Sequence, residues 1–397
     1  MNILIIGGGA AGMAAALTAS EAAENNVLLV ERQARMGRKL LSTGNGRCNL
    51  TNRVLSPENY HGQQAEFCRT ALTLFPPEET IEWFASMGLL TVTEAGGRGY
   101  PFSDSANSVA DVLRLHLEQR ENVTVETACE IETLRRSKGM FYAQAGERAF
   151  TADRVIVCAG GAAGGKLGGT ELGYRLLAGF GHKRTKIAPS LVQLRTEQGF
   201  VRALKGVRCQ ARVSDERQTL LGEVQFTDYG VSGPVIFALS RDFSVEGCRT
   251  LTFDFLPQTD RAALATLLER RQSALPQMKA SELLTGILHN RLGRMLLREA
   301  GISPEQPCGS VGQTERLCDA VKNLRLEVTG TMGLEQAQVT AGGIRTAEFD
   351  PATMESKICP GLYAAGEVLD IDGDCGGYNL QWAWASGRLA GQIRSSR

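Results

Sequence analysis

Residues 1–31 read MNILIIGGGAAGMAAALTASEAAENNVLLVE, and this stretch decides the fold of the first part of the chain. An apolar run at 2–6, short enough for a buried strand, leads into the glycine-rich segment GGGAAG. An Ala-rich segment of high helix propensity follows at 10–23, and a second apolar run ends in Glu31, about 20 residues after Gly12. This order of strand, glycine turn, helix, strand and acidic residue predicts a complete βαβ dinucleotide-binding unit.

The three glycines of the GxGxxG pattern have different expected roles. Gly7 allows the tight turn, Gly9 lets the backbone approach a pyrophosphate, and Gly12 lets helix and strand pack closely. The helix N-terminus adds unpaired N–H groups and the positive end of a dipole, and Glu31 can accept a hydrogen bond from a ribose hydroxyl. The unit predicts nucleotide binding, and from these residues alone the nucleotide is either FAD or NAD.

Bulk properties narrow the class of protein. No Lys or Arg precedes Arg32, so the basic region of a secretory signal is missing, and glycines interrupt the apolar run before it can span a membrane. With 43 basic and 43 acidic residues the net charge is zero, so we expect neither nucleic acid nor a membrane as partner. The ten cysteines form no CxxC and no zinc spacing, which predicts reduced thiols, a cytoplasmic protein and no metal site.

Two more glycine-rich segments follow strand-like runs. Residues 40–52, LLSTGNGRCNLTN, combine glycines with the donors Arg47 and Asn49 directly after the βαβ unit. Farther on, the buried-strand pattern 153–159 runs into GGAAGGKLGGT, which nearly matches a P-loop. Leu167 stands where Ser or Thr must hold magnesium, so we interpret this segment as a turn beside the first nucleotide site.

The pattern changes between about 188 and 340. Short alternating runs with turn residues predict an antiparallel sheet or barrel at about 188–257 and 324–340, with a helical part at about 258–323. We therefore expect one inserted domain that separates two parts of a nucleotide-binding domain. These two parts are residues 1–187 and 341–397.

Within the insert, residues 259–300 are predicted to be helical. Apolar positions recur at helical spacing from Leu283 through Leu292 to Leu296. We interpret this stripe as core packing rather than as a binding site.

The last part of the chain repeats the chemistry of the first. Residues 362–365 have a buried-strand pattern and are followed by Gly366 and Glu367, and the segment GGYN at 376–379 then opens a helix. This places a second set of backbone donors and a second helix dipole near one ligand. An NAD dehydrogenase would not need that second set, whereas a flavin dinucleotide would.

Four motifs carry a resemblance to known proteins: GGGAAG with Glu31, KLLSTGNGRCNLTN, FTDYGVSGP from Phe226 to Pro234, and VTAGGI with the C-terminal stretch TMESKICPGLYAAGEVLDIDGDCGGYNLQWAWASGRLAG. They resemble FAD-dependent oxidoreductases of the two-dinucleotide-binding-domain flavoprotein superfamily. More narrowly, they resemble a bacterial flavoprotein family of aminoacetone-oxidase-like and 3-dehydro-bile-acid Δ4,6-reductase-like proteins. The implied fold is α/β, a Rossmann-like FAD-binding domain interrupted by an inserted β-barrel plus a helical subdomain that lies over the flavin.

The resemblance implies that FAD binds non-covalently along both parts of the split domain. The glycines of GGGAAG would hold the pyrophosphate, Glu31 the adenosine ribose, and backbone near Ile131 the adenine. The loop 42–49 would line the ribityl and phosphate region, and the 377–380 helix start would reach the isoalloxazine. The complete set of expected FAD contacts is Gly7, Gly9, Ala10, Ala11, Gly12, Glu31, Arg32, Lys39, Ser42, Gly44, Gly46, Arg47, Cys48, Asn49, Ile131, Ala159, Gly160, Gly366, Glu367, Gly377, Tyr378, Asn379 and Leu380.

The expected reaction is hydride transfer through FAD on a small or medium organic substrate. Arg98 is a candidate to pair a substrate carboxylate, Tyr100 and Tyr229 are candidate proton donors, and Asp228 occupies a position where the family often has His. Cys48 has no partner cysteine for disulfide reduction. A reductase would take electrons from NAD(P)H, entering transiently, and saturate an activated C=C bond. The alternatives are an amine oxidase that passes electrons to oxygen and, in another class, a flavin-binding RNA-modification or binding protein.

Overall fold

The computed structural model describes residues 1–393, which form two compact units. The first unit contains residues 1–189 and the described residues from 334 onward, and the second contains residues 190–333. The predicted fold class is confirmed, because the first unit holds a Rossmann-type parallel sheet and the second holds a closed β-barrel with helices. Among the helices of the described residues, none combines the length and the apolar character that a membrane span needs.

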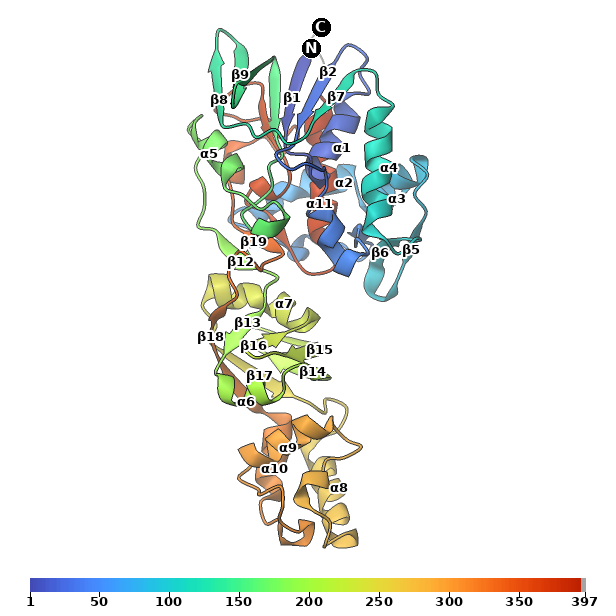
Figure 1. Ribbon diagram of the computed structural model, residues 1–397, viewed down its shortest axis with the longest axis vertical. Helices are drawn as coiled ribbons and strands as arrows, with labels where there is room; N and C mark the ends of the chain where they lie inside the picture. The colour runs from blue at the N-terminus through green and yellow to red at the C-terminus, as the bar shows by residue number, and fades with distance from the viewer. Residues whose placement is uncertain (394–397) are drawn as a thin grey trace. The chain divides into compact units, whose positions relative to one another are not determined.

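The first unit is built on a parallel sheet with the strand order β20-β11-β1-β2-β7 (Figure 1). Ile5 and Leu29 are partners in register, and both are completely buried, as expected for parallel strands with both faces covered. Because β1 ends directly before the glycine turn, that turn lies at the carboxyl edge of the sheet, where open α/β sheets bind ligands. The strands are β1 (Asn2–Ile6), β2 (Asn26–Val30), β7 (Val123–Glu126), β11 (Arg154–Val157) and β20 (Leu362–Ala364).

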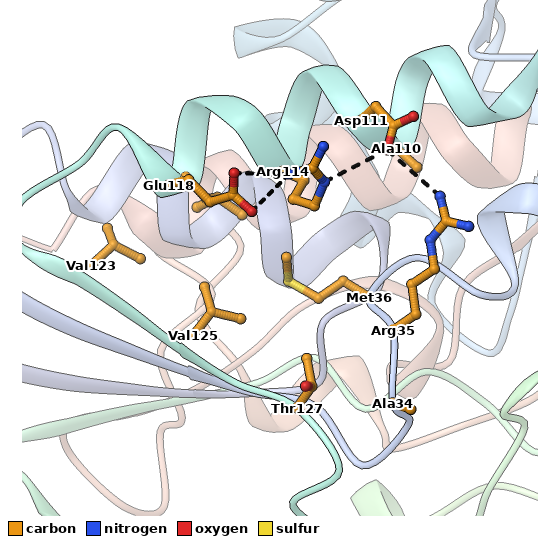
Figure 2. A pocket seen from close by; sticks show the side chains of 11 residues that line it. Ala34, Arg35, Met36, Ala110, Asp111, Arg114, Glu118, Val123, Val125 and Thr127 are labelled. Carbon is orange, nitrogen blue, oxygen red and sulfur yellow. Dashed lines mark hydrogen bonds and ion pairs between the residues drawn. The ribbon is translucent and has the colours of Figure 1, made fainter.

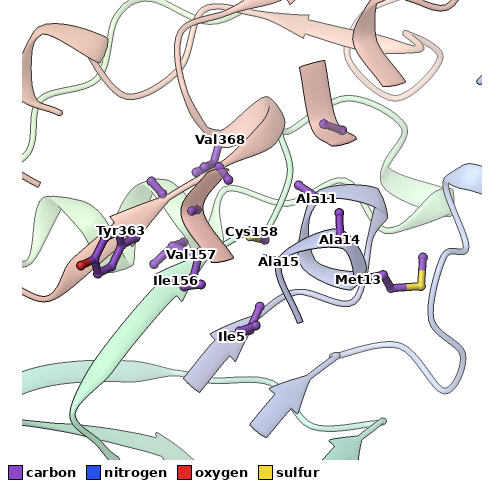
Figure 3. Packing of buried hydrophobic residues seen from close by; sticks show 14 of the residues in the cluster. Ile5, Ala11, Met13, Ala14, Ala15, Ile156, Val157, Cys158, Tyr363 and Val368 are labelled. Carbon is purple, nitrogen blue, oxygen red and sulfur yellow. The ribbon is translucent and has the colours of Figure 1, made fainter. Parts of the chain in front are cut away.

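Two helices, α1 (Ala10–Ala19) and α11 (Tyr378–Gly391), pack against each other through small residues. A Cβ atom on Gly387 would lie 2.3 Å from the carbonyl oxygen of Ala11, and one on Gly391 would lie 2.6 Å from that of Ala15. Figure 3 shows α1 side chains packed in one core with β1 and β11. The close approach joins the N-terminal βαβ unit to the last helix of the described chain.

Smaller elements surround this core. Three strands form the antiparallel sheet β3-β6-β5, with β3 (Thr51–Asn52), β6 (Arg98–Pro101) and β5 (Thr91–Thr93), and β4 (Tyr60–His61) pairs with β21 (Asp372–Gly373). A three-stranded meander has the order β10-β9-β8, and Pro76 lies between the helices α2 and α3. The other elements are α2 (Arg69–Leu74), α3 (Pro77–Ser86), α4 (Ala106–Glu118), β8 (Thr133–Ser137), β9 (Met140–Ala145), β10 (Arg148–Ala152), α5 (Leu172–Ala178), β12 (Ala188–Ser190) and β19 (Val339–Ala341).

The second unit contains a closed barrel with the order β13-β16-β15-β14-β17-β18. Alternate residues such as Val224 and Phe226 on one strand, and Leu251 and Phe253 on another, are completely buried and fill the barrel. The strands are β13 (Leu194–Thr196), β14 (Arg208–Ser214), β15 (Thr219–Phe226), β16 (Gly230–Ser232), β17 (Thr250–Asp254) and β18 (Leu324–Thr331). The helices are α6 (Gln198–Ala203), α7 (Pro234–Arg241), α8 (Arg261–Ala274), α9 (Asn290–Glu299) and α10 (Thr314–Lys322).

The segment 259–300, predicted to be helical, is helical at both ends but interrupted in between. Helix α8 ends at Ala274, and α9 begins only at Asn290. Pro276 and Gly286, whose φ is +79°, interrupt the segment, and the Arg271 guanidinium donates to carbonyl groups within it. The leucines of the apolar stripe are nevertheless buried, because the connecting segment packs its side chains into the same core.

Candidate functional site

The turn after β1 and the first turn of α1 each contain one position that has room for glycine alone. Gly7 has a φ of +111°, and a Cβ there would lie 2.3 Å from the carbonyl oxygen of Cys158. A Cβ on Gly12 would lie 1.8 Å from the carbonyl oxygen of Gly7. At Gly9 the surroundings differ, because no atom outside its own helix and chain neighbours lies within 4 Å of the Cβ position. The first turn of α1, with its N–H groups, is therefore open to an anionic ligand.

Glu31 ties this turn to the end of β2. One carboxylate oxygen accepts a hydrogen bond from the Gly8 N–H at 2.7 Å, and the other accepts one from the Gln33 N–H at 2.7 Å. Each oxygen keeps further acceptor capacity, so the carboxylate can still receive a ribose hydroxyl. Sequence reasoning missed the contribution of Glu31 to the shape of the turn, because spacing alone does not reveal contacts with backbone N–H groups.

Other predicted cofactor residues lie beside this turn. Lys39 forms an ion pair with Glu367 at 2.7 Å, and the second oxygen of Glu367 accepts from the Thr340 N–H at 2.9 Å. The Arg32 side chain instead donates to the carbonyl oxygen of Gly169 at 3.2 Å, which directs it toward the glycine-rich loop after β11. The Lys39 pair therefore connects the loop after β2 with the segment after β20.

Three more predicted contacts lie at or near strand ends. Ala159 and Gly160 follow β11, and the Cα of Ala159 lies 3.0 Å from the Cβ position of Gly7. Ile131 is almost fully buried before β8. The structure thus places Ala159 beside the GGGAAG turn.

The N-terminus of α11 is crowded, unlike that of α1. Gly377 has a φ of +103°, and a Cβ there would lie 2.5 Å from the carbonyl oxygen of Thr51 and 2.9 Å from Oδ1 of Asn49. Asn379 uses its side chain to hold the preceding turn, accepting from the Gly373 N–H and donating to the Gly373 carbonyl. Within residues 1–393, the buried Oδ1 of Asn49 has no hydrogen-bond partner, so it is an acceptor that a bound cofactor can satisfy.

The loop that precedes Asn49 has an unusual backbone. Gly44, Asn45, Gly46 and Cys48 all have positive φ values between 57° and 87°. Such conformations are strained for Asn45 and Cys48, and strain of this kind concentrates at ligand-binding sites. The Cys48 side chain is fully buried, and burial raises the pKa of its thiol to about 12, so it is no thiolate nucleophile at neutral pH.

Arg47, between these strained positions, is held by the protein itself. Its guanidinium pairs with Glu94 and Asp104 and lies over the Tyr100 ring, 4.1 Å from the centroid. The hydrogen bonds to Glu94 and then to Asp104 hold the pKa of Arg47 above its usual value. Neither carboxylate was among the residues selected from the sequence, because nothing in the spacing of Glu94 and Asp104 connects them with the 44–49 loop.

Arg98 and Tyr100, two candidate catalytic residues, lie two positions apart on β6. The ring of Tyr100 is buried, and burial raises the pKa of its hydroxyl, with Arg98 and Arg47 acting in the opposite direction. The Nε atom of Arg98 is 3.8 Å from the Cβ position of Gly376, just before α11. The structure therefore brings Arg98 and Tyr100 together beside the start of α11.

The other two candidates, Asp228 and Tyr229, belong to the second unit, in the turn between β15 and β16. The Lys205 ammonium donates to Asp228 at 2.6 Å, and both side chains are about half exposed or more. That hydrogen bond lowers the pKa of Asp228, which is therefore an ionised carboxylate at neutral pH. Their catalytic roles stay predictions.

A pocket of about 410 Å³ lies elsewhere in the first unit, between α4, β7 and the loop at 34–36 (Figure 2). Its floor is apolar, with Met36, Val123 and Val125, and Arg114 stands at its rim in an ion pair with Glu118. None of the predicted cofactor or catalytic residues lines it.

A parallel sheet flanked by two glycine-opened helices, with an acidic residue at the end of β2, is the arrangement of a Rossmann-type dinucleotide-binding domain. The family model described as "HI0933-like protein Rossmann domain" matches residues 1–393, and the chain belongs to this family. The open first turn of α1 fits the pyrophosphate of FAD, and the unpaired oxygen of Asn49 fits a donor group elsewhere on the same cofactor.

Individual relatives agree with this assignment. The chain is 40% identical to a 3-dehydro-bile acid delta(4,6)-reductase of Clostridium scindens, over 100% of this chain and 99% of that protein. It is 30% identical to a ribosomal RNA dihydrouridine synthase of Escherichia coli, over 97% of this chain and 96% of that protein. A solved quinol-fumarate reductase with menaquinol shares the fold, with a TM-score of 0.52 and 15% identity, covering 98% of this chain and 70% of that one.

Proposed function

We propose that this flavoprotein reduces a C=C bond conjugated with a carbonyl group, in a small or medium organic substrate, with electrons from NAD(P)H. The observation that carries the proposal is the 40% identity, over the whole chain, to a protein named as a delta(4,6)-reductase of a 3-dehydro compound. The dihydrouridine synthase name also denotes addition of hydrogen to a C=C bond beside a carbonyl. Two relatives with different substrates thus share one bond chemistry, which favours reduction over amine oxidation.

The residues around the two helix ends suit this reaction. The open first turn of α1 at Gly9 would hold the pyrophosphate, and Glu31 the adenosine ribose. FAD, when bound, supplies the hydride acceptor and donor. The N-terminal dipole of α11 at Gly377 would stabilise negative charge on the reduced ring system, and Asn49 would accept a hydrogen bond from the cofactor.

Tyr100 is our candidate proton donor. Burial raises the pKa of its hydroxyl, so it is protonated at neutral pH, and Arg47 on its ring limits its motion. The proton completes the reduction after hydride addition to the C=C bond. Asp228 and Tyr229 remain candidates from the second unit.

The test is anaerobic stopped-flow spectroscopy of the purified holoprotein. We expect NADPH or NADH to bleach the flavin absorbance, and a cyclic enone to restore it. Full FAD content without bleaching by either nucleotide would reject the nicotinamide donor. Bleaching followed by reoxidation with an amine-derived imine, but with no enone, would reject C=C reduction.

Ribosomal RNA is the second candidate substrate, and the identity to the Escherichia coli dihydrouridine synthase supports it. The absence of a nucleic-acid partner, expected from the zero net charge, therefore stays a prediction. Incubation of unmodified ribosomal RNA with enzyme and NADPH at low salt, followed by mass spectrometry of nucleosides, separates the two. Dihydrouridine formation together with inactivity on free enones would favour RNA.

A further inference from the structure

The central sheet ends at β7, and one side of this strand has no partner strand in the described part of the chain. On the paired side, the Glu31 N–H donates to the Glu126 carbonyl at 2.8 Å. In a parallel ladder this register directs the backbone groups of Thr124 toward β2 and those of Val125 away from it. Within residues 1–393, neither the N–H nor the C=O group of Val125 has a hydrogen-bond partner.

The pocket between α4 and β7 leaves apolar side chains uncovered beside this edge (Figure 2). Val123 and Val125 lie on its floor and are half-buried. Proteins commonly protect an edge strand with Lys or Pro, because unpaired backbone groups beside apolar side chains readily pair with another strand. The sequence of β7 contains neither residue type, so the strand lacks both of these forms of protection.

The exposed face of α4 carries a row of charges next to the edge of β7. The residues at helical spacing on this face are Asp111, Arg114, Leu115 and Glu118. Arg114 donates to both carboxylate oxygens of Glu118 at 2.8 Å, and the Arg35 guanidinium lies 3.6 Å from Asp111. The four charged side chains are 41–55% exposed. Because Asp111 precedes Glu118 by two helical turns, about 10 Å, Arg35 and Glu118 lie at opposite ends of the row.

We propose that this surface, named the edge face, binds a second copy of the same chain. The edge face consists of Arg35, Asp111, Arg114, Leu115, Glu118 and Val125. A two-fold axis perpendicular to the sheet passes beside Val125, so the two β7 strands run antiparallel and the two Val125 residues exchange N–H···O=C bonds. Two five-stranded sheets thereby join into one continuous sheet. The inference goes beyond the proposed function and does not depend on it, because the edge face contains none of the residues assigned to FAD or to catalysis.

The charges of the edge face favour a copy of the same chain as the partner. The two-fold axis reverses the row of charges, so Glu118 faces Arg35 of the partner subunit at both ends of the interface. With two basic and two acidic side chains, the edge face complements itself better than it complements a uniformly acidic or basic partner. Leu115, 47% exposed in one chain, lies near the axis and is covered by the partner. The zero net charge of the whole chain adds no repulsion between copies.

The first measurement is the mass of the purified holoprotein by sedimentation velocity and light scattering. We expect twice the mass of the 42.8 kDa chain, with dissociation to one chain on dilution. A wild-type holoprotein that stays monomeric up to its solubility limit would overturn the proposal.

Val125→Pro tests the pairing of the two strands. The substitution removes the outward N–H and leaves the ladder to β2 intact, because Thr124 and Glu126 make those hydrogen bonds. We expect a monomer with the flavin content and circular dichroism spectrum of the wild type. A folded, FAD-loaded variant that is as dimeric as the wild type would exclude pairing through β7. Charge variants on the surface test the same interface without altering the strand.

Arg35→Glu and Glu118→Arg test the register of the two copies. Either variant alone creates two like-charge contacts, so we expect the dissociation constant of the dimer to rise at least about tenfold. An equimolar mixture should restore dimerisation, because each acidic side chain of one variant then faces a basic side chain of the other. Arg69→Glu, at an exposed arginine paired with Glu66 on α2, is the matched control and leaves the constant unchanged. Equal constants in all variants, or a mixture no tighter than its components, would overturn the edge face.

Discussion

The two helices that open on glycine, α1 and α11, use that glycine for different reasons. At α1, the Cβ position of Gly9 has open space, and the crowded position is Gly12, one turn farther along the helix. At α11, the first glycine itself is crowded, because Gly377 lies against the backbone of Thr51. The α1 end leaves space beside its glycine that a ligand can enter, whereas the glycine of the α11 end lies against the protein's own backbone.

This difference teaches how to interpret glycines at nucleotide sites. Gly9 has ordinary backbone angles, with a φ of −81°, so an alanine there would fold normally and interfere with a ligand alone. Gly377 has a φ of +103°, so an alanine there would strain the protein whether or not a ligand is bound. We therefore predict that the same residue type serves ligand binding at one helix and conformational stability at the other.

The largest expected effect is at Gly12. In Gly12→Ala the new methyl group would overlap the Gly7 carbonyl oxygen, 1.8 Å away, so α1 must separate from the turn. We expect loss of more than about 3 kcal/mol of unfolding free energy and loss of bound FAD. Urea denaturation and flavin content per protein measure both. Gly199→Ala, at a position in α6 with open surroundings, is the control and should be neutral.

Gly377→Ala sharpens the comparison from the α11 side. The left-handed conformation and the nearby Thr51 carbonyl should reduce the unfolding free energy by about 1–3 kcal/mol, in apoprotein and holoprotein alike. Urea denaturation with and without excess FAD measures this loss. A variant that is destabilised in the holoprotein alone would contradict a conformational role for Gly377.

Gly9→Ala should affect FAD binding and leave the stability of the apoprotein unchanged. We expect an apoprotein as stable as the wild type, with a dissociation constant for FAD at least tenfold higher, or about 1.4 kcal/mol. Fluorescence titration of the apoprotein with FAD gives this constant. An unchanged affinity would mean that the first turn of α1 is not a cofactor contact, and the contrast between the two helix ends would fail.

The smallest effect is expected at Cys48, next to Asn49 at the α11 end. Its pKa of about 12 leaves roughly one thiolate in ten thousand at pH 8, and reactivity should increase only as the pH approaches that value. Mass spectrometry should find no alkylation of Cys48 by iodoacetamide in the native protein at pH 8. Cys48→Ser should keep the rate of flavin reduction, and a large loss would give the thiol a role in the reaction.

The sequence predicted the parts of the fold that local pattern controls. The strand–glycine–helix order of residues 1–31 corresponds to β1, α1 and β2, because each element has its own hydrophobic pattern and glycines mark the boundary between strand and helix. The pattern failed at 259–300, where apolar spacing continued across a break between α8 and α9. Tertiary packing buries the apolar residues on both sides of that break in one core. The spacing of apolar residues in the sequence does not distinguish such packing from a single helix.

The candidate site was predictable to the extent that glycine and acidic spacing define it. Glu31 was found from its distance along the chain, but its hydrogen bonds to the Gly8 and Gln33 N–H groups needed the folded turn. Arg47 was expected to contact FAD, and the structure shows its charge paired with Glu94 and Asp104, far away in sequence. Such ion pairs depend on tertiary contacts, and the sequence around Arg47 does not indicate them.

The interruption of the first unit by residues 190–333 has a consequence for how the chain is made. The central sheet needs β20, and α1 needs the small residues of α11, so neither can be completed until residues 362–391 have emerged from the ribosome. At roughly 5–20 residues per second, synthesis from the end of the barrel unit to the end of α11 takes about 3–12 seconds, during which the barrel unit can fold first. Until α11 has been made, the face of α1 that packs on Gly387 and Gly391 lacks its partner helix and leaves apolar surface exposed.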